Sequence, residues 1–175
     1  MLIALGETPL GVDEFDALIQ AAVSSATAAS VDPVIKKSTN ETITTDITLG
    51  ADAVLVYPMA ANKGYTFHAI ISYQSATAAG FQWDFTGPGG ETNIAWILSV
   101  VNPGAAIPTA SANSGSYPGE NLAVVTATTP GQIHLELHVQ NGATAGNLSF
   151  RWAQGTSNAG DTTVLSGSKI TVTEA

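Results

Sequence analysis

Residues 63–75, KGYTFHAIISYQS, and residues 80–86, GFQWDFT, decide the fold class. Aromatic and aliphatic side chains occupy every second position in both stretches, which is the period of a β-strand and not that of a helix. Alternate side chains of a strand lie on one face, so we expect two strands that pack on a common core. The residues that would share the apolar faces are Tyr65, Phe67, Ala69, Ile71 and Tyr73 in the first stretch and Phe81, Trp83 and Phe85 in the second.

Further strands are expected on both sides of this pair. The stretches with strand-like composition are 41–49, 53–59, 92–101, 122–128, 132–140, 148–154 and 169–174. The turns between them, rich in Gly, Pro, Asn or Ser, lie at 87–90, 128–131, 141–147 and 166–168. Short strands with such turns are typical of an all-β sandwich or barrel. We predict a mainly β fold over residues 34–175, a jelly-roll-like antiparallel β-sandwich.

Residues 1–33 differ in composition and are predicted to form a separate N-terminal segment. A short apolar arm opens it, and one amphipathic α-helix follows from Asp13 to about Ala29, because apolar residues recur three and four positions apart. This helix could pack on its own β domain, or it could meet copies of itself and anchor the chain to a larger assembly. The residues with which this segment would bind a partner are Met1, Leu2, Ile3 and Leu5 in the arm and Phe15, Leu18, Ile19, Ala22, Val23 and Ala26 in the helix.

Charged residues are scarce, at 11% of the 175 residues, against roughly 25% in an average soluble domain. Five basic and 14 acidic residues give a formal net charge of −9. Binding to nucleic acid or to an anionic membrane needs clustered Lys and Arg, so we expect neither partner. The absence of cysteine excludes disulfides and thiolate metal sites. Because neither a signal peptide nor a transmembrane stretch is recognisable, we expect a chain that is made and used in soluble form.

Two stretches contain no charged residue, 17–31 and 93–119. The first belongs to the predicted helix. The second joins an apolar strand, which would be buried on both sides or face a partner, to a loop from Asn102 to about Asn121. Loops longer than roughly 12–15 residues in a compact domain are usually functional. We therefore regard both stretches as candidate contact surfaces, with Trp96 and Leu98 as contact residues on the strand. The loop itself could cover a neighbouring subunit or lie exposed.

The best candidate for a metal site consists of His134, Glu136 and His138. On a strand these side chains share one face, and zinc or iron can be held by two histidines and a carboxylate. Neighbours on that face are about 7 Å apart, so one ion could not bind all three unless the strand curved. The alternative is a polar strand face turned to solvent or to another subunit. His68 lies on the polar face of its own strand, and no sequence pattern joins it to the other two histidines. We predict no resident metal and no cofactor.

No catalytic group is recognisable, and we predict that the chain is not an enzyme. It has no G-x-S-x-G motif, and residues 87–90 lack the Lys-Ser/Thr of a phosphate-binding loop. Asp84 and Glu136 could form the carboxylate pair of a glycosidase, but each alternates with core residues as an ordinary outward-facing acid does. Four aromatic residues that could form a sugar-binding platform fall in register with core positions instead: Tyr73, Trp83, Trp96 and Trp152.

Residues 34–175 resemble a module that recurs in the virion proteins of tailed bacteriophages. The stretch KSTNETI, which begins at Lys37, is similar to the K-S-x-[DN]-E-x-[VI] start of that module. A hydrophobic strand, A-N-x-x-Y-x-F, an aromatic strand ending in G-P, and W-A-Q-x-x-S-x-A follow in the same order. The matching residues are Ala61-Asn62, Tyr65, Phe67, Gly87-Pro88, Trp152-Ala153-Gln154, Ser157, Ala159 and Gly167-Ser168.

This resemblance implies a structural role in the virion and brings no catalytic residues with it. A chain of this length with a short anchor is similar to a capsid decoration or head-fibre protein. Such a protein would self-associate, as a trimer, on the outer surface of the particle and contact the major capsid or tail proteins. The alternatives are a minor tail or tail-fibre protein and a receptor- or glycan-binding module. The family often has consecutive acids where residues 49–53 here hold one, Asp52, so no calcium site is implied.

Overall fold

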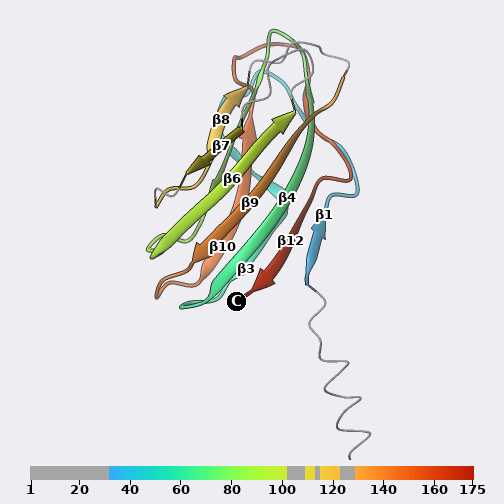
Figure 1. The fold of residues 1–175 in the computed structure, drawn as a ribbon. Coiled ribbons are helices and arrows are strands. Elements are labelled where there is room, and N and C mark those ends of the chain that lie inside the picture. The colour runs from blue at the N-terminus through green and yellow to red at the C-terminus, as the bar shows by residue number, and fades with distance from the viewer. Residues whose placement is uncertain (1–31, 102–108, 113–114, 123–128) are drawn as a thin grey trace, which may run out of the picture. The chain divides into compact units, whose positions relative to one another are not determined.

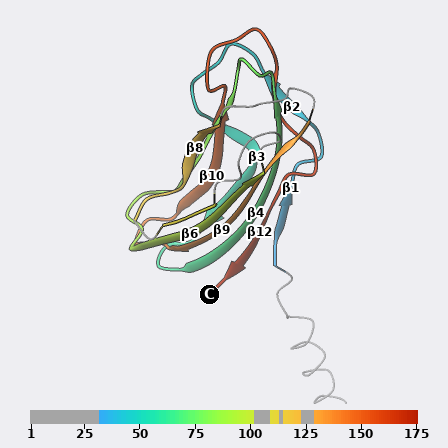
Figure 2. The ribbon, with the colours of Figure 1, turned by 45° about the horizontal axis from the view of Figure 1, so that its top comes forward.

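Antiparallel β-sheet makes up the regular structure of the described residues, which in the computed structural model are 32–101, 109–112, 115–122 and 129–175 (Figures 1 and 2). The predicted arm and helix, with all of their candidate contact residues, lie outside this part of the chain, as do residues 123–128 of one predicted strand. Within the described residues, no helix is long and apolar enough to cross a membrane. The prediction of a mainly β fold is confirmed.

The described strands form two sheets, here called sheet A and sheet B. Sheet A contains β1 (Val34–Lys36), β2 (Glu41–Ile43), β4 (Gly64–Ser75), β6 (Asn93–Val101), β7 (Thr109–Ala112), β9 (Gly131–Gln140), β11 (Thr162–Val164) and β12 (Lys169–Glu174). Sheet B contains β3 (Gly50–Met59), β5 (Phe81–Thr86), β8 (Gly119–Leu122) and β10 (Gly146–Ala153). Sheet A has the order β1-β12-β4-β9-β6-β7, with β11 pairing with both β2 and β4, and sheet B has the order β3-β10-β5-β8.

The two sheets share one hydrophobic core. The side chains predicted for the apolar faces of β4 and β5 are all buried, so the alternation in these strands is confirmed. The ring of Tyr73 in sheet A stacks on the ring of Phe81 in sheet B, with centroids 4.4 Å apart. Alternate residues of β6, β9, β10 and β12 complete the core. Burial of each large apolar side chain contributes about 1.5–3 kcal/mol, so this layer is the main source of stability.

The strand pairs are nested in the sequence. Strand β1 pairs with β12, β3 with β10, β4 with β9 and β5 with β8, and all four pairs are antiparallel. The chain therefore follows one long ribbon of paired strands whose successive pairs alternate between sheet A and sheet B. Strands β6 and β7 form a hairpin between β5 and β8 and extend sheet A beyond β9. This insertion widens the outer face of sheet A, where the candidate site lies.

Residues 41–49 were expected to form one strand, and this expectation was wrong beyond Ile43. Thr45 has a φ of 60°, which a strand does not accommodate. Its backbone N–H donates to the carbonyl of Asn158 at 3.0 Å. The Asp46 carboxylate accepts the backbone N–H of Thr48 at 2.8 Å. The segment after β2 thus follows the loop that contains Asn158 and pairs with no strand.

The long loop expected from Asn102 to Asn121 contains two strands, β7 and β8. Strand β7 pairs with β6, and β8 pairs with β5. Their sequences, TASA and GENL, are short and show no alternation of apolar and polar residues. Strands β1 and β11 have three residues each and were missed for the same reason.

Strand β6 was expected to be buried on both sides or to face a partner, and only one side is buried. Ile94, Leu98 and Val100 point into the core, whereas Ile97 on the opposite face is 54% exposed. Leu98 was predicted to contact a partner. This prediction was wrong: Leu98 is 1% exposed, because it shares the inward face with Ile94, four residues earlier on the strand.

Candidate functional site

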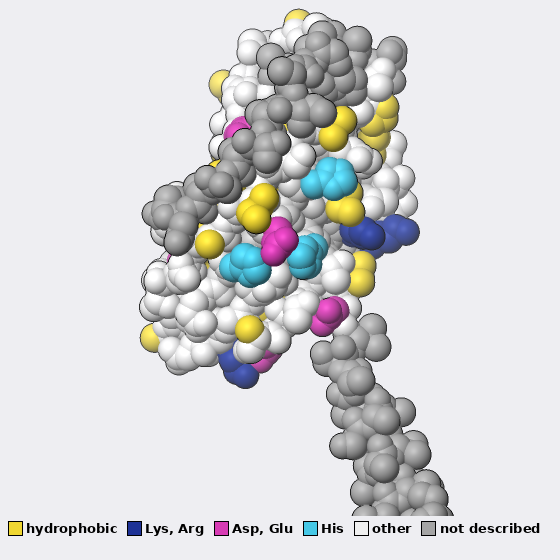
Figure 3. Space-filling model, in the orientation of Figure 1, with side chains coloured by type: hydrophobic (Ala, Val, Ile, Leu, Met, Phe, Trp, Pro, Cys, Tyr) yellow, Lys and Arg dark blue, Asp and Glu magenta, His cyan; other side chains and the backbone are white. Residues whose placement is uncertain are grey.

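All three histidines of the chain lie on the outer face of sheet A, around one acidic side chain (Figure 3). His68 belongs to β4, and His134, Glu136 and His138 alternate along β9. The predicted sharing of one face by these three residues of β9 is confirmed. His68 lies directly opposite Glu136 in the register of β4 and β9, and on the other side Glu136 lies opposite Ile97 of β6. The fold therefore adds to this group the histidine that sequence reasoning could not place.

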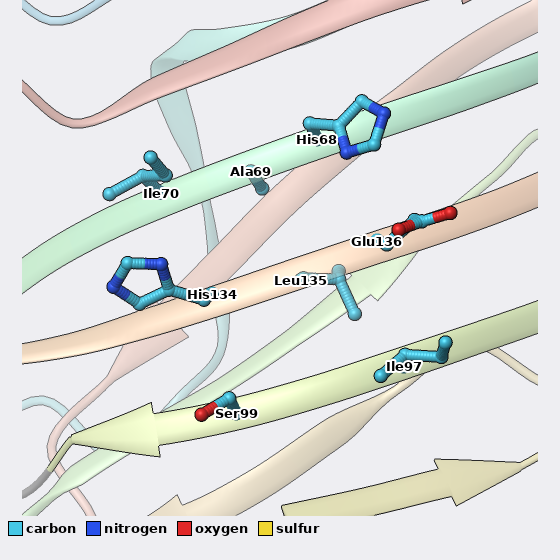
Figure 4. A pocket seen from close by; sticks show the side chains of 8 residues that line it. All are labelled: His68, Ala69, Ile70, Ile97, Ser99, His134, Leu135 and Glu136. Carbon is cyan, nitrogen blue, oxygen red and sulfur yellow. The ribbon is translucent and has the colours of Figure 1, made fainter.

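A shallow hollow of about 310 Å³ lies in this face between β4, β9 and β6 (Figure 4). The residues that line it are His68, Ala69 and Ile70 of β4, His134, Leu135 and Glu136 of β9, and Ile97 and Ser99 of β6. Ala69 and Leu135 are buried in the core, and the other six side chains stand on the outer side of the sheet. The hollow can receive an apolar side chain next to imidazoles, which can donate or accept hydrogen bonds.

Hydrogen bonds within the face link its polar side chains to one another. Nε2 of His138 lies 2.9 Å from Oε1 of Glu136, and Nδ1 of the same ring lies 3.0 Å from the hydroxyl of Thr66. Nε2 of His134 lies 3.1 Å from Oε1 of Gln132. Within the described residues, no three His, Asp or Glu side chains are grouped as metal ligands. What this arrangement can provide is hydrogen bonding to another molecule.

Exposed aliphatic side chains accompany the histidines. Ile97 is 54% exposed and Val101 is 40% exposed, both on the outer face of β6. Trp96, predicted as a contact residue, is partly buried against the core, and its Nε1 donates to the carbonyl of Ser116 at 3.2 Å. Glu136 is the one carboxylate on the outer faces of β4, β9 and β6, and those faces carry no Lys or Arg. The area that β4, β9 and β6 form on the outer face of sheet A is therefore apolar and weakly charged, whereas Lys36 and Lys169 lie on β1 and β12 of the same sheet.

A second polar cluster is buried where the end of β1 meets β3. Lys37, directly after β1, is 2% exposed, and Asp52 of β3 is fully buried. Nζ of Lys37 donates to Oδ2 of Asp52 at 2.7 Å and also to Oε2 of Glu41. The other oxygen of Asp52, Oδ1, accepts the backbone N–H groups of Val54 at 2.9 Å and Leu55 at 3.0 Å. This ion pair joins sheet A to sheet B.

Hydrogen bonds keep both members of this pair charged. Burial lowers the pKa of Lys37, but the hydrogen bonds to Asp52 and Glu41 outweigh it, so the pKa lies above its usual 10.5. Burial raises the pKa of Asp52, but the bond from Lys37 and the two backbone N–H donors outweigh it, so this pKa lies below its usual 3.8. Sequence reasoning missed the cluster, because no spacing relates residue 37 to residue 52.

The two alternatives that involve sugars are not supported by the geometry. Asp84 lies on sheet B, where Nε of Arg151 donates to its Oδ1 at 2.8 Å and a second guanidinium nitrogen donates to its Oδ2. Glu136 lies on the outer face of the other sheet, so the two carboxylates do not converge. The prediction that the platform aromatics are core residues is confirmed for Tyr73, Trp83 and Trp152, which are buried, and Trp96 is partly buried.

The residues that carry the phage resemblance form turns and core. Asn62, in the turn between β3 and β4, has a φ of 58°, and Gly167, before β12, has a φ of 87°. Gln154 is buried, donates to the carbonyl of Gly160 at 2.7 Å and accepts the N–H of Asn158 at 2.9 Å. It thereby folds the loop after β10. The motif residues support the scaffold, and none of them lies on the outer face of sheet A.

No family model matches the sequence, and no curated protein matches it. Solved structures of infectious bursal disease virus are similar over most of this chain. A structure of the Gt strain is 13% identical over 83% of this chain and 40% of that chain, with a TM-score of 0.22. A structure of the VP2 subviral particle is 13% identical over 80% of this chain and 39% of that chain, with a TM-score of 0.20. This chain thus spans about 40% of the length of those chains. The proposals below rest on the chain's own residues.

Proposed function

We propose that the chain is a non-enzymatic structural protein of a tailed-bacteriophage virion, a capsid decoration protein that self-associates, as a trimer, on the outside of the particle. The outer face of sheet A carries this proposal, because it presents exposed Ile97 and Val101 beside a hollow on a weakly charged surface. The ordered motifs of residues 34–175 support the phage assignment. Residues 1–33 would attach the protein to the major capsid or tail proteins.

The β domain is proposed to be a jelly roll. The nested strand pairs support this, because a jelly roll is a long paired ribbon wound into two sheets of four strands. The pairs β1·β12 and β4·β9 contribute four strands to sheet A, and β3·β10 and β5·β8 contribute four to sheet B. Strands β2, β6, β7 and β11 are additions. Many viral capsid domains have this fold, but a fold does not determine a function. The proposed function therefore has to be argued from the residues on the surface of the domain.

A second copy of the chain suits the outer face of sheet A. Ile97 is exposed and lines the hollow of this surface, so copies gathered around a symmetry axis can bury this apolar side chain against one another. Copies with a net charge of −9 repel each other, and the area of β4, β9 and β6 adds little to this repulsion because it carries one carboxylate. Strands β4, β9 and β6, of 12, 10 and 9 residues, cover on the order of 500 Å², more than half of the roughly 800 Å² per partner of a standard interface.

Sedimentation velocity of the full chain tests self-association. We expect a trimer for the natural sequence and a monomer for Ile97→Asp, because the interface would bury an unpaired carboxylate. Ile47→Asp is the matched control, since Ile47 is 53% exposed but lies in the segment between β2 and β3. A natural sequence that stays monomeric at high concentration would reject self-association. A trimer that survives Ile97→Asp would reject this face as the interface.

Deletion of residues 1–33 tests attachment. Virions assembled with the truncated chain are expected to lack it, whereas virions with the full chain carry it, as measured by mass spectrometry of purified particles. Full occupancy by the truncated chain would contradict a role of this segment in anchoring. Cryo-electron microscopy of the same virions distinguishes a capsid decoration protein from the alternative, a minor tail or tail-fibre protein, by where the density lies.

A further inference from the structure

The cluster of Lys37, Asp52 and Glu41 places a buried amine and a buried carboxyl group next to a second carboxylate, Glu41, which is 39% exposed. The side chains of Lys37 and Asp52 are 2% and 0% exposed. A buried ion pair generally stabilises a fold no better than apolar side chains of the same size, because removing both charges from water is costly. Stabilisation alone therefore does not account for this arrangement, and its geometry fits a reaction.

We propose that Lys37 and Asp52 form an intramolecular isopeptide bond, with Glu41 as the catalytic residue. Nζ of Lys37 adds to Cγ of Asp52, the Cγ–Nζ bond forms, the Cγ–Oδ2 bond breaks and one water leaves. Of the three ammonium protons, one remains on the amide nitrogen and two leave with Oδ2. The positive charge of Lys37 and the negative charge of Asp52 both disappear, so no oxidant, reductant or other reactant is needed.

Glu41 is placed to move the protons. A neutral amine adds to a neutral carboxyl group and not to a carboxylate, so the reaction starts from the minor form in which one proton has moved from Nζ of Lys37 to Oδ2 of Asp52. Oε2 of Glu41 accepts a hydrogen bond from Nζ and can carry this proton. The same carboxyl group can then pass the second proton to Oδ2 of Asp52 as it leaves, because both oxygens lie next to Nζ. Proton transfer by a positioned carboxylate typically accelerates a reaction by about 10²–10⁴-fold.

The backbone holds Asp52 ready for attack. Its Oδ1 accepts two N–H groups, from Val54 at 2.9 Å and from Leu55 at 3.0 Å. Oδ1 becomes an oxyanion when Nζ adds to Cγ, and two backbone donors aimed at such an oxygen stabilise the negative charge. The other oxygen, Oδ2, lies 2.7 Å from Nζ of Lys37. The amine is therefore roughly 3.5 Å from Cγ, a distance from which addition can proceed.

A second amine–carboxylate pair of the chain provides an internal comparison. Nζ of Lys63 lies 2.7 Å from Oε1 of Glu174, the same distance as in the buried pair. The two side chains are 51% and 47% exposed, so water solvates both charges. The two pairs therefore have the same nitrogen–oxygen distance, but only the pair of Lys37 and Asp52 is buried. We expect Lys63 and Glu174 to remain unlinked.

The bond would close a ring at the point where the chain enters the β domain. It would join the residue after β1 in sheet A to β3 in sheet B. In the described part of the chain, β1 pairs with β12 alone. A mechanical force applied at the N-terminal side of the domain acts first on β1 and would separate it from β12. The cross-link would stop that separation at residue 37.

Mass spectrometry of the full chain tests the proposal. We expect the intact mass of the denatured protein to be about 18 Da below that of the sequence, which is the loss of one water. Trypsin locates the bond, because cleavage after an unmodified Lys37 releases residues 38–63. With the bond, cleavage occurs after Lys36 but not after Lys37. The peptide of residues 37–63 is then about 18 Da light and contains both linked residues.

Two variants complete the test. Glu41→Gln keeps the size and the hydrogen-bonding reach of the side chain, so we expect a folded chain by circular dichroism in which the bond forms about 100-fold more slowly or not at all. Lys37→Met removes the nucleophile and should restore the full mass. A natural sequence that keeps its full mass after long incubation at neutral pH overturns the proposal. A loss of water that persists in Lys37→Met, or that maps to Lys63, overturns it as well.

Discussion

Leu98 and Ile97 are neighbours in the chain with opposite surroundings, and they separate folding from association. Leu98 is 1% exposed and Ile97 is 54% exposed. We expect Leu98→Ala to lower the free energy of unfolding by about 2–5 kcal/mol, because it removes buried methyl groups and leaves a cavity. Ile97→Ala should change it by less than about 0.5 kcal/mol in the monomer. Urea unfolding at low protein concentration measures both, and equal losses would contradict the assignment of the two faces.

Tyr73 is predicted to make the chain less stable at high pH. Its hydroxyl is buried and has no hydrogen-bond partner among the described residues. Burial, and to a lesser extent the charge of Glu120, raise the pKa of Tyr73 from 10.0 to about 12. The folded chain therefore holds this proton more tightly than the unfolded chain does. The stability that results is complete below pH 10 and is lost as the pH rises towards 12.

The variant Tyr73→Phe isolates this effect. It removes an unpaired buried hydroxyl, so the free energy of unfolding at neutral pH should stay the same or rise by up to about 1 kcal/mol. Its decline between pH 10 and pH 12 should be smaller than that of the natural sequence. Urea unfolding at neutral pH and at both ends of this range provides the comparison. Identical alkaline declines in the two proteins would show that Tyr73 does not titrate as predicted.

The loop after β10 depends on one buried side chain, Gln154. Its amide donates to the carbonyl of Gly160 and accepts the N–H of Asn158, and its backbone N–H donates to the carbonyl of Asp46. We expect Gln154→Ala to cost about 1–3 kcal/mol, because two backbone groups lose their partner. Hydrogen exchange should accelerate in residues 155–161. Gln82→Ala, on the outer face of β5, is the control, and equal exchange in both variants would contradict this role.

Strands with strong alternation could be predicted from the sequence, and short ones could not. The apolar positions of β4, β5 and β9 follow from the period of two, because one face of each strand packs on the core. Strand β7 is stabilised by pairing with β6, and β8 by pairing with β5. The amino-acid composition of β7 and β8 alone does not predict this pairing. The ion pair of Lys37 and Asp52 likewise depends on how β1 and β3 meet.

The orientation of β6 shows where periodicity fails. Both of its faces contain apolar residues, with Ile94 and Leu98 on one and Ile97 and Val101 on the other. Alternation along the strand assigns these residues correctly to two opposite faces. It does not show which of the two faces points into the core. The register of β6 against β9 decides it, because Leu98 lies opposite the buried Leu135 and Ile97 lies opposite Glu136. A contact residue on this strand could therefore be chosen only with the sheet in view.

At the scale of the whole molecule, the net charge of −9 opposes the proposed assembly. Raising the ionic strength from 0.01 M to 0.15 M shortens the screening length from about 30 Å to about 8 Å. Repulsion between copies then falls, while the contacts of an apolar face are hardly affected. We therefore expect the dissociation constant of the oligomer to fall several-fold over this range. Sedimentation equilibrium at several salt concentrations measures it.

The variant Glu136→Gln separates the charge of the whole chain from the charge at the face. It removes the one carboxylate on the outer faces of β4, β9 and β6 and leaves the other 13 of the 14 acidic residues in place. If repulsion between whole molecules controls the salt effect, the variant keeps nearly the full dependence on salt. Association that weakens as salt is added would contradict this account. It would mean that attraction between opposite charges, such as a protonated histidine of one copy and Glu136 of the next, holds the oligomer together, and Glu136→Gln would then abolish the effect.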